Sequence, residues 1–171
     1  MVSIFVLGFY FGTFAQTGKP KNKKAELLEK IHWLIERSDT KTVISEFPKI
    51  CDENNLPSLV AGLKDGTYKG STPYDDYGYK HEVKFKMKAG KMVSIDYDEV
   101  HRDGHAKQND HVYGIRMLQS GTTPSIAYPE YESGMLEKQN FNQIDAVSGA
   151  TYSLYRFKLA ILYAIMNSGQ L

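Results

Sequence analysis

The stretch Gly78–Val100, GYKHEVKFKMKAGKMVSIDYDEV, alternates apolar or aromatic residues with charged residues over its first half. A period of two places successive side chains on opposite faces of a β-strand. We predict a strand over 79–88, a two-residue turn at Ala89-Gly90 and a return strand over 91–97, which together form an antiparallel hairpin. The core face of the first strand would carry Tyr79, His81, Val83, Phe85 and Met87.

The opposite face of this hairpin is rich in lysine and admits two interpretations. Lysines recur at alternate positions from Lys80 to Lys88, interrupted only by Glu82. They could bind an anion, but lysines on the outer face of an antiparallel sheet are usually solvated, and we favour that reading. A further strand is predicted over 66–71, where Thr67 and Tyr68 lie between glycines.

Helical periodicity surrounds the hairpin. Apolar residues recur at helical spacing over 23–37, and Ser38-Asp39-Thr40 can cap a second, short helix that Pro48 would limit. Shorter helices are predicted over 56–64, 112–119 and 130–140. The last helix, from Tyr152 to Met166, has only three clearly polar residues and should be largely buried. The sequence thus predicts an α+β fold: an antiparallel sheet with a central hairpin packed against helices, a buried C-terminal helix and an N-terminal helical extension.

Composition excludes several classes of protein. The 171 residues carry a net charge of +1, so no global charge favours binding to nucleic acid or to a membrane surface. Cys51 is the single cysteine, which rules out an intrachain disulfide and a CxxC redox pair. Any redox chemistry must therefore come from a cofactor. The 12 tyrosines suit a half-buried sheet or the walls of a site for a planar ligand.

The N-terminal stretch Val2–Ala15 is apolar and uncharged. It is shorter than the roughly 20 residues that cross a bilayer. Thr13-Phe14-Ala15 offers small residues at the first and third positions before a cleavage point. Because no Lys or Arg precedes Lys19, a buried N-terminal strand is the alternative to a signal peptide. We favour export, with residues 1–15 as the signal peptide.

A polar loop is predicted after the hairpin. It contains His101, His105, His111, Asp98, Asp103 and Asp110. His101 and His105 are four residues apart, a spacing that binds a metal when both lie on one helix face, whereas Asp103-Gly104 predicts a turn. An EF-hand loop that starts at Asp96 would require glycine at its sixth position. That position is His101, so the EF-hand pattern also fails. We therefore expect no metal site here.

The tetrapeptide Ser148-Gly149-Ala150-Thr151 directly precedes the buried C-terminal helix. The first backbone N–H groups of a helix have no partner within that helix. The side chains of Ser148, Thr151 or Ser153 could cap them. Alternatively, the small residues could let a phosphate approach the free N–H groups, where the helix dipole favours negative charge.

The segment Asp145–Thr151, DAVSGAT, matches the pattern Asp-x-x-(Ser/Thr)-Gly-Ala-Thr at every fixed position. It resembles the covalent-flavin attachment signature of the FMN-binding domain family. Asp65–Gly70 and the hairpin are similar to earlier parts of that domain, and the resemblance covers about residues 64–167. Met92 departs conservatively from the isoleucine that is more frequent in the family. Its members include subunits of sodium-pumping quinone reductases, subunits of Rnf-type electron-transport complexes and exported flavoproteins.

The resemblance implies that Thr151 carries FMN through a phosphoester bond. A separate flavin transferase, which uses FAD and a divalent metal, would make this bond. Gly149 and Ala150 would leave room for the phosphate and the transferase, and Ser148 would be a further cofactor-binding residue of the motif. The transferase would recognise Asp145, or Asp145 would anchor the turn through an Asx-type hydrogen bond. From their positions, the walls of the flavin ring could be Tyr77, Tyr79, Tyr113 and Met117. Negative charge on a reduced flavin could be stabilised by His105, Lys107 and Arg116.

The sequence therefore predicts an exported flavoprotein that acts as an electron-transfer carrier rather than as a stand-alone enzyme, since no GxGxxG follows a strand. The alternatives are a module that binds FMN or another phosphorylated ligand without redox turnover, and a small exported domain in which the turn is only a helix cap. Expected partners are the transferase and a redox protein or membrane electron-transport chain, with no nucleic acid and no permanent membrane span. The expected location is periplasmic or secreted. The predicted division is a signal peptide (1–15), a linker with the helical extension (16–63) and an FMN-binding domain (64–171).

Overall fold

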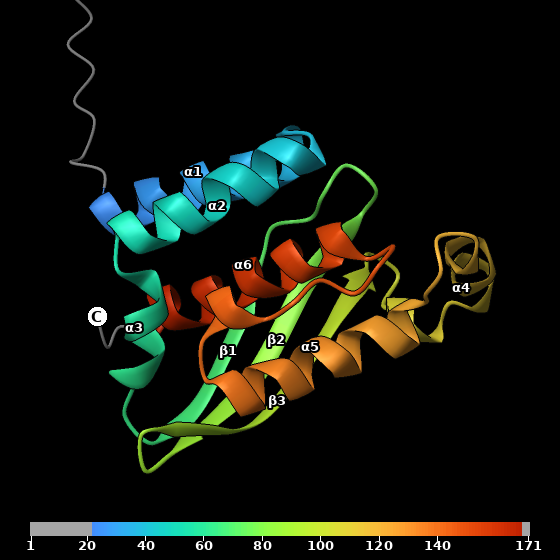
Figure 1. Ribbon diagram of the computed structural model, residues 1–171. Coiled ribbons are helices and arrows are strands. Elements are labelled where there is room, and N and C mark those ends of the chain that lie inside the picture. The colour runs from blue at the N-terminus through green and yellow to red at the C-terminus, as the bar shows by residue number, and fades with distance from the viewer. Residues whose placement is uncertain (1–21, 169–171) are drawn as a thin grey trace, which may run out of the picture.

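The computed structural model describes residues 22–168, which form one antiparallel sheet and six α-helices within that range (Figure 1). The strand order is β1-β2-β3. The strands are β1 (Gly66–Ser71), β2 (Tyr79–Lys88) and β3 (Lys91–His101). The predicted α+β class is confirmed. The predicted signal peptide lies outside the described residues.

The β2–β3 hairpin has the predicted register and faces. Phe85 pairs with Ile95, and the turn residues Ala89 and Gly90 have φ angles of 52° and 72°. The inward side chains of β2 are buried from His81 to Met87, as the alternation predicted. However, β3 continues to His101, four residues beyond the predicted end, because the start of β2 at Tyr79 pairs with it. Part of the predicted polar loop is therefore strand.

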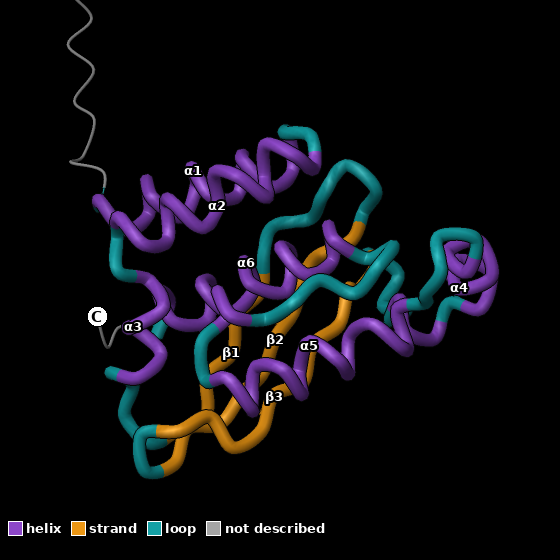
Figure 2. The backbone as a smooth tube through the Cα atoms, in the orientation of Figure 1, coloured by secondary structure: helices purple, strands orange, loops and turns teal. Residues whose placement is uncertain are grey.

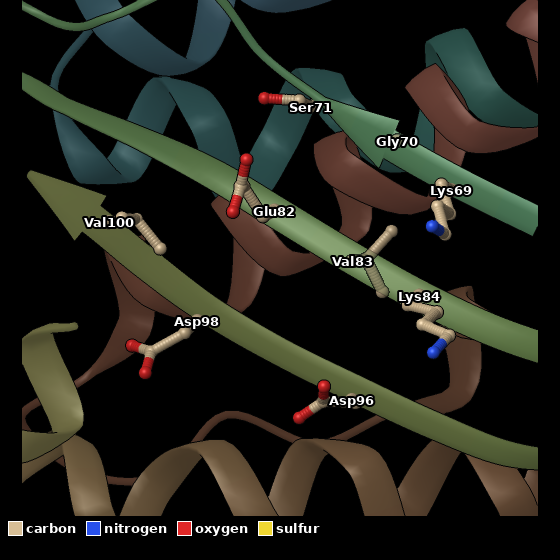
Figure 3. A pocket seen from close by; sticks show the side chains of 9 residues that line it. All are labelled: Lys69, Gly70, Ser71, Glu82, Val83, Lys84, Asp96, Asp98 and Val100. Atoms are coloured by element: carbon tan, nitrogen blue, oxygen red, sulfur yellow. The ribbon is translucent and has the colours of Figure 1, made fainter. Parts of the chain in front are cut away.

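The other face of the sheet is exposed. An open depression of about 580 Å³ lies over it (Figure 3). The lysines here stand beside carboxylates: Lys84 pairs in register with Asp96, and Lys80 Nζ lies 2.6 Å from Glu82 Oε1. The mixed charge of this face favours the solvated interpretation over an anion site.

The helices other than α4 lie on the inner side of the sheet, and α4 lies beyond the end of α5 (Figure 1). The helix bounds are α1 (Lys23–Arg37), α2 (Thr40–Glu53), α3 (Leu56–Ala61), α4 (His111–Leu118), α5 (Pro124–Lys138) and α6 (Thr151–Asn167). Helix α6 contacts β1 and β2 and also α1, α2 and α3, whereas α5 packs beside it against β3 (Figures 1 and 2). Because α6 has neighbours on both sides, it is buried nearly all round, as its apolar sequence predicted. Within residues 22–168, no helix has the length and hydropathy needed to span a membrane.

The contact between β1 and α6 depends on Gly70. A Cβ atom at this position would lie 2.4 Å from the Ala160 carbonyl oxygen and 2.4 Å from the Ala164 nitrogen. Both are backbone atoms of α6, so no side-chain rotation could relieve the overlap. Glycine at the end of DGTYKG therefore lets the central helix lie directly on the sheet.

Several predicted helix bounds were wrong. Pro48 lies inside α2, which continues to Glu53, although it was expected to limit the helix. Proline removes one backbone hydrogen bond, but Phe47, Ile50 and Cys51 on the same helix are buried in the core, and this burial outweighs the loss. Helix α3 ends three residues early, at Ala61, and α5 begins six residues before the predicted start, with Pro124 in its first turn.

Candidate functional site

The turn before α6 is held by two neighbouring elements. Gly149 has a φ of 81°, and a Cβ atom there would lie 2.1 Å from the carbonyl oxygen of Ser120, in the loop between α4 and α5. From α5, the buried hydroxyl of Tyr131 donates a 2.8 Å hydrogen bond to the carbonyl oxygen of Ala150. The turn is thus placed by tertiary contacts as well as by its own small residues.

The N-terminus of α6 has no side-chain cap. Ala150 occupies the N-cap position with φ −127° and ψ 25°, and no side-chain capping hydrogen bond is formed. Capping by Ser148, Thr151 or Ser153, one of the two predicted alternatives, is therefore wrong. Within the described range, the first-turn backbone N–H groups of Thr151, Tyr152 and Ser153 have no hydrogen-bond acceptor. These are the groups to which an anion can bind.

The side chains of the motif differ in exposure. Ser148 and Asp145 are exposed, Thr151 is half-buried and Ala150 is buried. Thr151 is the first residue of α6, and its own N–H is one of the free groups. Among residues 22–168, Asp145 accepts no hydrogen bond, so the predicted Asx-type anchor is not formed. The motif residues fit a phosphate bound at an open helix N-terminus, where the helix dipole adds favourable charge.

Two predicted ring walls, Tyr79 and Tyr113, form one cluster with two residues predicted to stabilise charge, His105 and Lys107. Lys107 Nζ lies 4.3 Å from the ring centroid of Tyr79 and 4.4 Å from that of Tyr113. The Tyr79 hydroxyl lies 3.1 Å from Nε2 of His105. These separations are within the range of cation–π interaction and hydrogen bonding. The structure therefore brings together the predicted residues Tyr79, His105, Lys107 and Tyr113.

The other three predicted residues, Tyr77, Arg116 and Met117, do not belong to this cluster. Tyr77 projects from the β1–β2 loop with 79% of its surface exposed. Arg116 is exposed on α4, and Met117 on the same helix is buried in the core.

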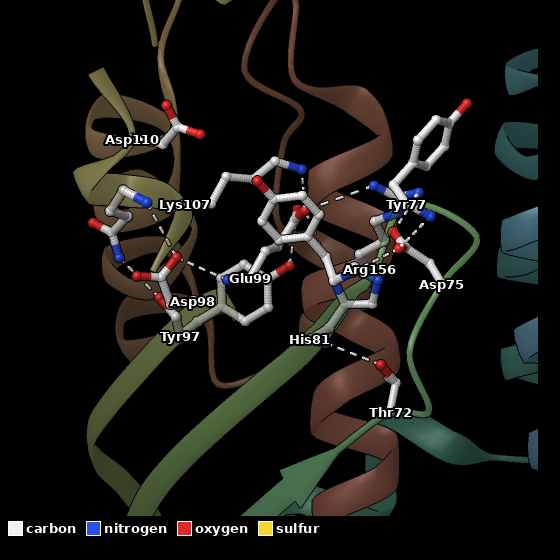
Figure 4. Close-up of polar contacts among 12 residues, drawn as sticks. Thr72, Asp75, Tyr77, His81, Tyr97, Asp98, Glu99, Lys107, Asp110 and Arg156 are labelled. Carbon is white, nitrogen blue, oxygen red and sulfur yellow. Dashed lines mark hydrogen bonds and ion pairs between the residues drawn. The ribbon is translucent and has the colours of Figure 1, made fainter. Parts of the chain in front are cut away.

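Lys107 is part of a buried ionic cluster that the sequence analysis did not identify (Figure 4). Its Nζ lies 2.6 Å from Oε2 of Glu99, which is completely buried. Arg156 of α6 lies 3.6 Å from the same oxygen and 3.1 Å from Glu36 of α1. Five residues after Thr151, Arg156 thus connects the start of α6 to the aromatic cluster.

Opposite charges keep the carboxylates of this cluster ionised. Burial raises the pKa of Glu99, but the charges of Lys107, His81 and Arg156 outweigh it and hold the pKa at about 2. Burial also raises the pKa of Glu36, and the contacts with His81 and Arg156 again bring it down to about 2. A sequence signal for the cluster existed, because His81 and Glu99 occupy inward positions in otherwise apolar alternations.

The fold and the site together define a small α+β domain that offers an open helix N-terminus to a phosphorylated ligand. The chain belongs to the FMN-binding domain family, whose family model matches residues 76–166. The resemblance seen in the sequence is thereby confirmed, and membership of the family indicates that FMN is the cofactor that the domain binds. The match lies within the predicted 64–171 domain, and β1, which pairs with β2, lies just before it.

The chain is also similar to two other proteins. The chain is 33% identical over 100 residues to the 15 kDa lipoprotein of Treponema pallidum (strain Nichols). The alignment covers 57% of this chain and 71% of that protein. The crystal structure of a Clostridium perfringens protein aligns with a TM-score of 0.58 and 34% identity, covering 63% of this chain and 89% of the other. The similarity extends beyond the motif to the arrangement of the domain.

Proposed function

We propose that this chain is an exported flavoprotein that carries FMN through a phosphoester bond to Thr151 and serves as an electron-transfer carrier. The observation that carries the proposal is the uncapped N-terminus of α6 at the DAVSGAT motif. A covalently held phosphate at Thr151 would lie beside free N–H groups and in the favourable field of a 17-residue helix.

Attachment needs no catalytic group in this chain. A threonine hydroxyl is a weak nucleophile, and the flavin transferase would supply the base or metal that activates it. In the transfer, the bond between the Thr151 oxygen and the FMN phosphorus forms, the pyrophosphate bond of FAD breaks, and AMP leaves. The exposed side chains of Asp145 and Ser148 are accessible to such an enzyme.

The bound FMN would supply reversible one- and two-electron transfer. Tyr79 and Tyr113 are the best-placed walls for the ring, because both are partly exposed and belong to one cluster. The charge of Lys107 is balanced by Glu99. His105 and Arg116 are exposed, so they are better suited than Lys107 to stabilise negative charge on a reduced flavin.

We also propose an extracytoplasmic location. The apolar stretch Val2–Ala15 supports it, and the similar Treponema protein is named a lipoprotein. N-terminal sequencing of protein purified from its native host should begin at Gln16. A native protein that retains Met1 to Phe14 would contradict cleavage after Ala15.

Coexpression with a flavin transferase tests the attachment. The wild type should remain yellow after denaturation, and peptide mapping should find the flavin on Thr151. Thr151→Ala should lose all covalent flavin while its melting temperature stays close to that of the wild type, because no capping bond is removed. Ser153→Ala, in the same helical turn, is the control and should keep the flavin.

Two results would change the proposal. Flavin that is released on denaturation would favour a module that binds FMN non-covalently. Flavin that persists in Thr151→Ala, or that maps to Ser148, would show that Thr151 is not the attachment point.

A further inference from the structure

The turn after β3 gathers two histidines around one aspartate. His101 Nδ1 lies 3.1 Å from Oδ1 of Asp103, and His105 Nδ1 lies 2.5 Å from the same oxygen. The two imidazole rings are 4.9 Å apart between centroids. The sequence predicted a turn at Asp103-Gly104 in place of a shared helix face, and therefore no metal site. The turn does form, but it reverses the chain and so brings the histidines together.

The backbone holds this turn in shape. The His101 N–H donates to the His105 carbonyl oxygen at 2.9 Å, and the Gly104 N–H donates to the His101 carbonyl oxygen at 2.9 Å. The His105 N–H donates to Oδ1 of Asp103 at 3.1 Å. The positions of the three side chains therefore follow from a hydrogen-bonded backbone.

The far nitrogen of His105 has polar partners. His105 Nε2 lies 3.1 Å from the Tyr79 hydroxyl and 3.7 Å from a carboxylate oxygen of Asp110. Within residues 22–168, His101 Nε2 forms no hydrogen bond; the ring packs against Gly78, where an added Cβ atom would lie 2.9 Å from Nε2. Both rings turn Nδ1 toward Asp103, and the His105 ring is also oriented by the contacts of its second nitrogen. Histidines that bind metals are characteristically oriented by such a partner on the second nitrogen.

We propose that His101, Asp103 and His105 form a binding site for a divalent transition-metal ion. One ligand atom from each residue lies within 4.8 Å of the others. A common centre is then at most about 2.8 Å from each atom, so shifts of about 1 Å reach the ~2.0–2.1 Å of a Zn²⁺–nitrogen bond.

The donor set selects the kind of metal. Two imidazole nitrogens and one carboxylate oxygen suit Zn²⁺, Co²⁺ or Ni²⁺ better than Ca²⁺ or Mg²⁺, which prefer oxygen ligands. The side chains are accessible, with 30% of His101, 61% of Asp103 and 41% of His105 exposed. Solvent can therefore deliver the ion and complete its coordination with water.

The simpler alternative is an ion-pair cluster with no metal. In that case, protonated Nδ1 atoms of both histidines would donate hydrogen bonds to Asp103. An added metal ion would not displace those protons. The two explanations differ in whether added metal binds one-to-one and in which histidines it requires.

Metal titration of the native-sequence chain, without an affinity tag and without flavin loading, separates them. Zn²⁺ binding should be saturable at one equivalent in competition with a chromophoric chelator. Co²⁺ should give d–d absorption bands that Zn²⁺ abolishes. His101→Gln and His105→Gln should each weaken Zn²⁺ binding by at least about tenfold, and Tyr79→Phe should weaken it by about tenfold through the lost orienting contact.

His111→Gln is the matched control, since His111 is exposed on α4 and lies outside the three-residue group. It should bind Zn²⁺ like the wild type. Circular dichroism of each variant establishes that it is folded, and Asp103→Asn provides a second test at the third ligand. Non-saturable binding, or equal affinity in the wild type, His101→Gln and His105→Gln, would overturn the proposal. Because flavin is not involved, this result does not depend on Thr151.

Discussion

Lys107 Nζ and Glu99 Oε2 lie 2.6 Å apart, and both side chains are almost completely buried. Glu99 comes from the end of β3 and Lys107 from the short 3₁₀ helix that follows it (Lys107–Asn109). A buried charge without its partner costs much more free energy than an exposed one. This pair therefore ties the segment after β3 to the core.

Glu99→Gln should lower the free energy of unfolding by about 3–5 kcal/mol at pH 7, because it leaves Lys107 buried without its carboxylate. The pKa of Glu99 is depressed from 4.5 to about 2, so its contribution is present above pH 4.5 and is lost as pH falls toward 2. Urea denaturation at pH 7 and pH 3 should show a smaller difference from the wild type at pH 3.

The control for this prediction is Glu82→Gln on the exposed face of the same sheet. Its pair with Lys80 is 41% exposed on the Glu82 side and should contribute less than about 1 kcal/mol. If Glu99→Gln lowered the free energy of unfolding equally little, the buried pair would contribute no more than a surface pair.

Lys158 is buried in α6 beside the rings of Phe47 and Tyr155, and no carboxylate within the described segment forms an ion pair with it. Burial lowers the pKa of Lys158 from 10.5 to about 8, although Cys51 and Asp145 oppose the shift. The folded chain thus binds fewer protons than the unfolded chain between pH 8 and 10.5, and wild-type stability should rise with pH across that window.

Lys158→Met should therefore be more stable than the wild type at pH 7, by about 2 kcal/mol, since it removes the penalty of burying a charge. Its advantage should shrink as pH approaches 10. Denaturation series at pH 7, 8.5 and 10 measure this trend. Lys30→Met, at an exposed position on α1, should show no comparable trend, and a constant advantage for Lys158→Met would refute the titration.

Gly149→Ala should disturb the turn before α6 more than an ordinary glycine substitution. The new Cβ would lie 2.1 Å from the Ser120 carbonyl oxygen and overlap it. The alanine would also have to adopt a left-handed φ of 81°. Gly121→Ala is the matched control, because its φ is 97° but nothing lies within 4 Å of the added Cβ. The control should cost about 1–2 kcal/mol from conformation alone.

In chemical denaturation, Gly149→Ala should therefore be the less stable of the two. It should also acquire less covalent flavin in coexpression with the transferase. Equal stability of the two variants would mean that the contact with Ser120 relaxes without cost.

Phe85→Ala should lower the free energy of unfolding by about 3–5 kcal/mol. Phe85 is 1% exposed, and its ring stacks on that of Tyr68 with centroids 5.1 Å apart. Val93→Ala on β3, where 49% of the side chain is exposed, should cost less than about 1 kcal/mol. Thermal melts that rank the two variants in the opposite order would contradict the core assignment of this face.

Local patterns were sufficient for most of the fold. The alternation from Tyr79 to Met87 and the Ala89-Gly90 turn predicted the β2–β3 hairpin, because strand periodicity and turn conformation depend on neighbouring residues. Helix α1 was predicted with its observed bounds, since its apolar stripe and flanking caps are also local. The bounds of α2 and α5 were not, because tertiary burial carried helices through Pro48 and Pro129.

For the site, the sequence by itself determined the DAVSGAT motif, its position before a buried helix and the family resemblance, all of which are properties of contiguous residues. Only the tertiary structure decided that α6 begins without a cap, that Ser120 holds Gly149, and that Glu99, Lys107 and Arg156 share one buried cluster. The sequence predicted the turn at Asp103-Gly104 but not the proximity of His101 and His105, which depends on the path of that turn. Periodicity specifies which face a side chain occupies, but the distance between two side chains on different elements depends on how those elements pack.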